Sequence, residues 1–116
     1  MTQPEEEFVI VRTTTPTREE AGRLARMIVE NRLGACVQTW PVHSTYWWKE
    51  KIEEADECLL MIKTRRHIVS ALSTFISRNH PYDVPELVVT PVAGGADEYL
   101  AWIAAETDPG RKSNED

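Results

Sequence analysis

The sequence has few basic residues and no long apolar run. Each of these absences excludes a class of function. Its 116 residues include 13 Lys and Arg against 19 Asp and Glu, so the net charge is −6. This balance argues against a nucleic-acid backbone as the main partner, because phosphate binding needs a basic face. No stretch of about 18 apolar residues is present, so no membrane span is expected. The acidic residues 1–7 lack the layout of a signal peptide, which predicts a cytoplasmic protein.

Cysteine is scarce as well. Cys36 and Cys58 form neither a CxxC pair nor a zinc-finger spacing. If residues 35–48 and 52–64 pair as a hairpin, paired positions sum to about 100, and Cys36 lies opposite residue 64. Cys58 is then roughly 20 Å away along the strand. A disulfide requires Cα atoms within about 7 Å, so we expect two free, reduced thiols.

Hydrophobic periodicity divides the chain into one domain and two tails. β-branched residues predict a strand over residues 8–14, and Thr17 with Glu20 forms a capping box for a helix that Gly34 ends. The other predicted elements are strands over residues 35–48, 52–64 and 86–90, a helix from Ile68 that His80-Pro81 ends, and a last helix capped by Asp97. The expected divisions are a flexible segment 1–7, a domain 8–106 and a disordered tail 107–116.

The order of these elements predicts an α+β fold, a ferredoxin-like βαββαβ sandwich with a C-terminal helix. Proline cannot donate to a strand ladder, so it belongs on edge strands or at strand ends. Pro41 falls in the second strand, and Pro85 and Pro91 flank the fourth, whereas the first and third strands have none. The prolines therefore suit a sheet whose first and third strands are central.

The predicted hairpin of the second and third strands is too long for a domain of this size. Its strands have about 14 and 13 residues, whereas about five or six is usual. The overhanging end carries Tyr46, Trp47 and Trp48, a large aromatic surface to leave in water. These three residues are predicted to form an interface with other copies of the chain. The alternative is that the tryptophans fold back on their own sheet.

A second group of polar and ionisable side chains lies between the second predicted helix and the fourth predicted strand. His80, Tyr82, Asp83 and Glu86 occupy a segment stiffened by two prolines. Imidazole suits copper, nickel or zinc, and the carboxylates offer hard oxygen ligands, so these residues could line a cleft that binds a cation. The alternative is structural, with His80-Pro81 ending the helix and Tyr82 packed against the domain.

The segments Asn79–Glu86 and Tyr46–Ile52, in this order of elements, resemble the CutA family of divalent-cation tolerance proteins over roughly residues 8–106. The resemblance implies a homotrimer in which long hairpins pack on neighbouring subunits. It also implies tolerance to divalent metals and binding of copper(II) or another divalent cation, with no enzymatic activity.

The residues that bind metal in the family pattern are only partly present in this chain. In the metal-binding version of the family pattern, a cysteine ends the first strand and two histidines precede the proline. Thr13 and Asn79 occupy two of these positions, so His80 is the remaining candidate ligand and weak binding is expected. The family's turn usually reads Trp-x-Gly-Lys, whereas Glu50 stands in place of the glycine.

Two other classes share this order of elements. Acylphosphatases need a glycine-rich anion cradle after the first strand, which residues 13–18 lack. No sequence pattern indicates a catalytic triad, so an enzyme is not expected. The alternative function is a PII-like trimeric signalling module that binds a nucleotide or other small ligand between subunits. No phosphate-binding glycine motif supports it, because Gly94-Gly95 is followed by acidic residues.

Overall fold

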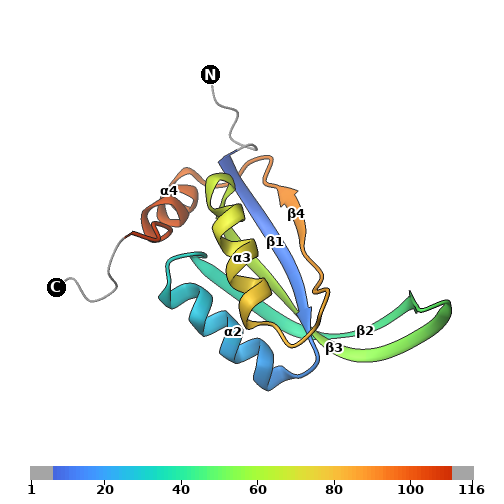
Figure 1. Cartoon of the computed structure of the whole chain (residues 1–116). Helices are drawn as coiled ribbons and strands as arrows, with labels where there is room; N and C mark the ends of the chain where they lie inside the picture. The colour runs from blue at the N-terminus through green and yellow to red at the C-terminus, as the bar shows by residue number, and fades with distance from the viewer. Residues whose placement is uncertain (1–6, 111–116) are drawn as a thin grey trace.

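The computed structural model describes residues 7–110 of the chain (Figure 1). The predictions for residues 1–6 and 111–116 lie outside this part. Its elements, in chain order, are β1 (Phe8–Thr15), α2 (Arg18–Glu30), β2 (Cys36–Trp48), β3 (Lys51–Arg65), the 3₁₀ helix η1 (Arg66–Ile68), α3 (Val69–Asn79), β4 (Val88–Pro91) and α4 (Asp97–Glu106). No helix within residues 7–110 is long and apolar enough to cross a membrane.

The four strands form one antiparallel sheet in the order β2-β3-β1-β4, which confirms the predicted ferredoxin-like fold. Pro41 lies in β2 and Pro91 in β4, so both occupy edge strands, where a missing N–H donor costs little. Helices α2 and α3 lie side by side over one face of the sheet (Figure 1). The proline pattern therefore located the central strands correctly.

The core lies between this sheet face and the two helices. Alternate residues of β1 and β3 point into it, and residues at helical spacing on α2 and α3 meet them. The largest fully buried aliphatic side chains are Val9, Val11, Leu24, Ile28, Leu60, Ile62, Ile68, Leu72 and Ile76. Since each such burial stabilises the fold by about 1.5–3 kcal/mol, this cluster supplies the main driving force for folding.

The ends of the helices differ in part from the prediction. Thr17 caps α2 as predicted, because its hydroxyl accepts a hydrogen bond from the Glu20 amide at 3.1 Å. The prediction that Gly34 ends this helix is wrong, because α2 ends at Glu30 and Arg32 takes the left-handed conformation with φ 61°. A Cβ on Gly34 would lie 2.7 Å from Cγ2 of Ile62, so glycine is needed for close packing.

The last two elements also begin differently from the prediction. Strand β4 starts at Val88 and not at Glu86. Asp97 is the first residue of α4, and the cap residue is Ala96, which makes no side-chain hydrogen bond. Thr107, where the tail was predicted to begin, is buried, and its hydroxyl accepts a hydrogen bond from Nε of Arg65 at 3.0 Å. The folded unit therefore extends at least to this residue.

A two-stranded arm projects from the domain (Figure 1). Strand β1 pairs with β3 only from Cys58 to Arg65, whereas β2 pairs with β3 along its whole length. Residues 42–57, which we call the arm, thus have no third strand beside them. The arm reverses at Lys49 and Glu50, whose φ angles of 51° and 65° are those of a two-residue hairpin turn. The turn forms although Glu50 replaces the usual glycine.

The observed register accounts for the two thiols. Cys36 lies opposite Lys63, one position from the predicted partner, and Cys58 lies opposite Pro41. The two cysteines are therefore well separated along the hairpin. Both are free, which confirms the prediction, and Cys58 is buried in the core cluster.

Candidate functional site

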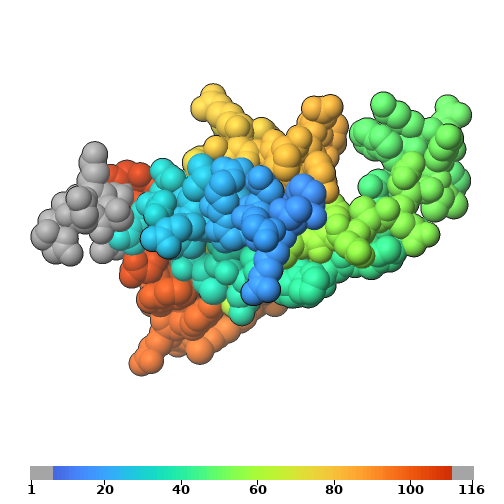
Figure 2. Space-filling model, turned by 90° about the horizontal axis from the view of Figure 1, so that it is seen from below, coloured from blue at the N-terminus to red at the C-terminus, as the bar shows by residue number. Residues whose placement is uncertain are grey.

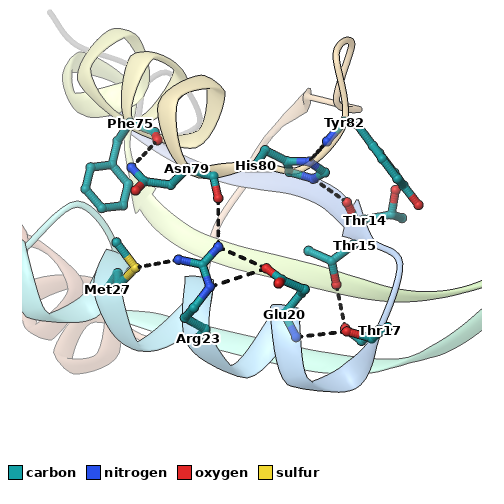
Figure 3. A network of polar contacts seen from close by, with 10 residues as sticks. All are labelled: Thr14, Thr15, Thr17, Glu20, Arg23, Met27, Phe75, Asn79, His80 and Tyr82. Carbon is teal, nitrogen blue, oxygen red and sulfur yellow. Dashed lines mark hydrogen bonds and ion pairs between the residues drawn. The ribbon is translucent and has the colours of Figure 1, made fainter.

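The segment after α3 is fixed by the imidazole of His80. His80 ends the helix with an extended backbone, and its Nε2 lies 2.6 Å from the carbonyl oxygen of Thr14 (Figure 3). The amide of Tyr82 donates to His80 Nδ1 at 3.1 Å. Because Nε2 must donate to a carbonyl and Nδ1 must accept from an amide, these partners select the neutral Nε2–H tautomer. His80 therefore connects this segment to the end of β1.

A second polar group holds the end of α3 against α2. Arg23 donates to the carbonyl oxygen of Asn79 at 2.9 Å and to Oε1 of Glu20 at 2.9 Å (Figure 3). The side-chain amide of Asn79 donates to the carbonyl of Phe75 at 2.8 Å. Asn79 is therefore engaged in terminating its own helix. The carbonyls at a helix end need such partners, which explains why this segment has a defined position.

Tyr82 reaches across to the arm. Its hydroxyl donates to Oε2 of Glu57 on β3 at 2.7 Å. Burial, this hydrogen bond and the negative charge of Glu57 all raise the pKa of Tyr82 above its usual value, so the phenol stays protonated and keeps donating. The segment is thus attached to β1 through His80 and to β3 through Tyr82.

An open cleft of about 610 Å³ lies between residues 81–86 and the arm. Figure 2 shows the hollow between the green arm and the yellow-orange segment. The predicted cleft residues Tyr82, Asp83 and Glu86 all line it, together with Tyr46 and Trp48 of the arm. Two segments distant in the sequence therefore meet at one site.

Two of the residues selected from the sequence lie apart from this lining. His80 points toward β1, where both of its nitrogens have partners. Trp47 alternates with Tyr46 and Trp48 along β2, so it points to the opposite face of the arm, where 71% of it is exposed. The tryptophans therefore do not fold back on their own sheet in the single chain.

The residues at the predicted metal site do not fit copper well. Thr13 is fully buried, and its hydroxyl has no hydrogen-bond partner within residues 7–110. A hydroxyl and the engaged amide of Asn79 replace the thiolate and imidazole that favour copper. His80 can offer a lone pair only by giving up the hydrogen bond from the Tyr82 amide. The described part of the chain has no group of three or more His, Cys, Asp or Glu residues that could hold a metal ion.

A separate charged group lies on the exposed face of the arm. His43 Nδ1 is 2.8 Å from Oδ1 of Asp56, and its Nε2 is 2.8 Å from Oε1 of Glu54. Hydrogen bonds to Glu54 and then to Asp56 raise the pKa of His43 above 6.5, because both carboxylates favour the imidazolium. The arrangement places one carboxylate on each ring nitrogen, which is an ion-pair geometry and not a shared metal site.

Sequence reasoning missed three polar residues of the cleft. Thr14, Ser44 and Glu57 come from three different strands and line it together. The hairpin register predicts that Glu57 lies opposite residue 42 on the neighbouring strand, but it predicts no other contact of Glu57. Its contact with Tyr82 spans 25 residues and depends on how the segment packs, for which the sequence gives no signal.

Comparison with known proteins agrees with this fold. The model of the CutA1 divalent ion tolerance protein family matches residues 9–106. The divalent-cation tolerance protein CutA of Thermus thermophilus is 41% identical over 103 residues, which cover 88% of this chain and 98% of that protein. The solved structure of the periplasmic divalent cation tolerance protein CutA from Archaeoglobus fulgidus has a TM-score of 0.85 at 33% identity, covering 87% of this chain and 99% of that chain.

A plant relative is longer. The chloroplastic protein CutA of Arabidopsis thaliana is 41% identical over 100 residues, which cover 85% of this chain and 55% of that protein. The chain thus spans about half the length of this relative. Since the family model covers most of the chain and the bacterial relative matches along nearly its whole length, the chain belongs to the CutA family of divalent ion tolerance proteins.

Proposed function

We propose that this chain acts as a divalent-cation tolerance protein in the form of a non-enzymatic homotrimer. The open strand edges of the arm are the main support for this assembly. Residues 51–57 of β3 pair on one side only, and β2 is an edge strand along its whole length. Such open edges need a covering chain, because exposed strands otherwise template aggregation.

The aromatic end of the arm supports the same assembly. Trp47 is 71% exposed, Ile52 opposite it is 63% exposed and Trp48 is 49% exposed. Large apolar side chains exposed on both faces of the arm are typical of a protein interface. Further copies of the chain are the natural partners, and three copies are the number that the family resemblance predicts.

The metal partner is proposed to be copper(II) or another divalent cation, bound weakly. His80 is the candidate ligand, and binding there must compete with the hydrogen bond from the Tyr82 amide. Copper(II) heads the divalent affinity series, so an exposed imidazole also binds some of it. His43 and His67 are exposed and are therefore the competing sites.

Calorimetry can separate these sites. Copper(II) titrations in competition with glycine should give weak binding to the wild-type protein, and His80→Gln should reduce it more than His43→Gln or His67→Gln. The competition removes signal from non-specific sites. Abolition of binding by His43→Gln or His67→Gln, with His80→Gln unchanged, would contradict the assignment of His80.

The tolerance role itself is tested by growth. A bacterial strain that lacks its own tolerance protein should regain growth on inhibitory copper(II) when this chain is expressed. The matched control is the same chain carrying Trp48→Ala, expressed at equal level, which should protect less because the arm is needed for assembly. Equal growth with and without the wild-type chain would refute this role.

The alternative, a nucleotide-binding signalling module, is not favoured. The cleft is lined by Glu57, Asp83 and Glu86 and by no basic residue, so it repels phosphate. We further propose that the protein works in the cytoplasm, since its two free thiols suit a reducing compartment. The related proteins are named for other compartments, chloroplastic in one case and periplasmic in another. Fractionation of the native cells would test this location.

A further inference from the structure

The arm receives little support from the sheet of its own domain. Strand β1 pairs with β3 only from Cys58 onward, so residues 42–57 form a ribbon of two strands (Figure 1). Such a ribbon is marginally stable in water and twists more strongly than a wider sheet. The sheet alone therefore does not fix the direction in which the arm leaves the domain.

Within the described chain, one side-chain hydrogen bond connects the arm to a residue outside the hairpin. The hydroxyl of Tyr82 donates to Oε2 of Glu57 at 2.7 Å. The other side-chain hydrogen bonds of the arm are both made by His43, and their partners lie in the arm itself. The bond between Tyr82 and Glu57 is therefore the polar contact that ties the arm to the rest of the domain.

Glu57 lies at the root of the arm, where a small change of angle has a large effect. It directly precedes Cys58, the first residue of β3 that pairs with β1. The turn at Glu50 lies roughly 25 Å farther out at the usual rise of a strand. A rotation of about 10° at the root therefore moves the aromatic end by roughly 4 Å. Closely packed interfaces do not tolerate such a shift.

Tyr82 is itself held on the side of the domain. Its amide donates to Nδ1 of His80 at 3.1 Å, and the centroids of the two rings are 4.9 Å apart. Nε2 of His80 donates in turn to the carbonyl of Thr14 near the end of β1 (Figure 3). A continuous path of contacts therefore runs from β1 through His80 and Tyr82 to the arm.

The bond between Tyr82 and Glu57 persists at neutral pH. Burial first, and then the hydrogen bond and the charge of Glu57, raise the pKa of Tyr82, so the phenol keeps its proton and remains a donor. A hydrogen bond to a charged acceptor is roughly twice as strong as one between neutral groups. Both side chains are half-buried, so water competes less for this bond than it does at an exposed surface.

We propose that Tyr82 is a positioning residue for assembly, a brace that holds the arm through Glu57 in the direction from which it reaches the next copy of the chain. This role rests on the proposed homotrimer and explains how each copy is prepared for it. A copy whose arm is already directed loses less conformational freedom on association, so assembly is tighter. In a closed ring of three copies every arm must be directed, so the effect of the brace enters three times.

Removal of one oxygen atom tests this role. Tyr82→Phe keeps the ring beside His80 and loses only the bond to Glu57. It should lower the association constant of the trimer at least roughly tenfold, measured in a dilution series followed by light scattering. Tyr99→Phe is the matched control, because this exposed phenol on α4 bonds to Lys63, away from the arm. It should leave the association constant unchanged.

Variants of Glu57 show whether the two side chains act through one bond. Glu57→Ala should weaken assembly as Tyr82→Phe does, and the two changes together should weaken it no further. Glu57→Gln keeps an oxygen that can accept from the phenol, so it should retain most of the association constant. Amide hydrogen exchange of β1 in each variant shows whether the domain stays folded, which distinguishes a lost fold from a misdirected arm.

Three results would overturn the brace. One is a Tyr82→Phe trimer that dissociates as the wild-type trimer does. Another is an equal weakening by Tyr99→Phe. The third is a double variant at Tyr82 and Glu57 whose effect is the sum of the two single effects. A wild-type protein that stays monomeric would instead refute the homotrimer, and the positioning role with it.

Discussion

Trp48→Ala is expected to weaken assembly of the chain by about 2 kcal/mol or more, which is roughly a 30-fold change in the association constant. The physical reason is that Trp48 lies at the end of an arm with no third strand beside it and is half exposed in the single chain. Only another chain can bury this ring. A dilution series followed by light scattering measures the effect.

Trp102→Ala is the matched control. Trp102 lies on α4, is 41% exposed and packs on Tyr99 in its own helix, so its loss should leave the assembly intact. Unchanged assembly of Trp48→Ala would remove this residue from the interface. Finding the wild-type protein monomeric at micromolar concentration would refute the proposed homotrimer.

His80→Ala is expected to destabilise the fold by about 2–4 kcal/mol, because it leaves two backbone groups without their partner. These groups are the carbonyl of Thr14, a buried residue, and the amide of Tyr82. Urea unfolding at one fixed protein concentration measures the change, since the stability of an oligomer depends on concentration. His80→Gln should recover part of the loss, because its amide can still donate to a carbonyl.

His67→Ala provides the baseline for this measurement. His67 is exposed in η1 and should change stability by no more than about 0.5 kcal/mol. If His80→Ala costs no more than His67→Ala, the imidazole is not a structural link between the segment and β1. Its nitrogens would then be available to a metal, and the copper site would have to be reconsidered.

The fold could be predicted from the sequence because its signals are local and repeated. A run rich in β-branched residues predicted β1, the capping box at Thr17 predicted the start of α2, and His80-Pro81 predicted the end of α3. Prolines on β2 and β4 even distinguished edge strands from central ones. The errors arose where local rules compete with packing, as at Gly34, whose role is to admit the side chain of Ile62.

The candidate site could be predicted only in part from the sequence. Pattern reasoning selected Tyr82, Asp83 and Glu86 and, independently, Tyr46 and Trp48, and all five line one cleft. Nothing in the pattern said that the two sets face each other. It also could not show that the ring nitrogens of His80 are both occupied, because their partners are backbone groups that any residue could supply.

By itself the sequence determined the order of the elements, the strand positions in the sheet, the free thiols and the aromatic end of an overlong hairpin. Each of these depends on residue type at short spacing or on a register counted from one turn. Only the tertiary structure decided that the arm and residues 81–86 enclose a carboxylate-lined cleft and that Tyr82 joins them through Glu57. That contact depends on the direction in which the segment leaves α3, which is set by long-range hydrogen bonds to β1 and β3.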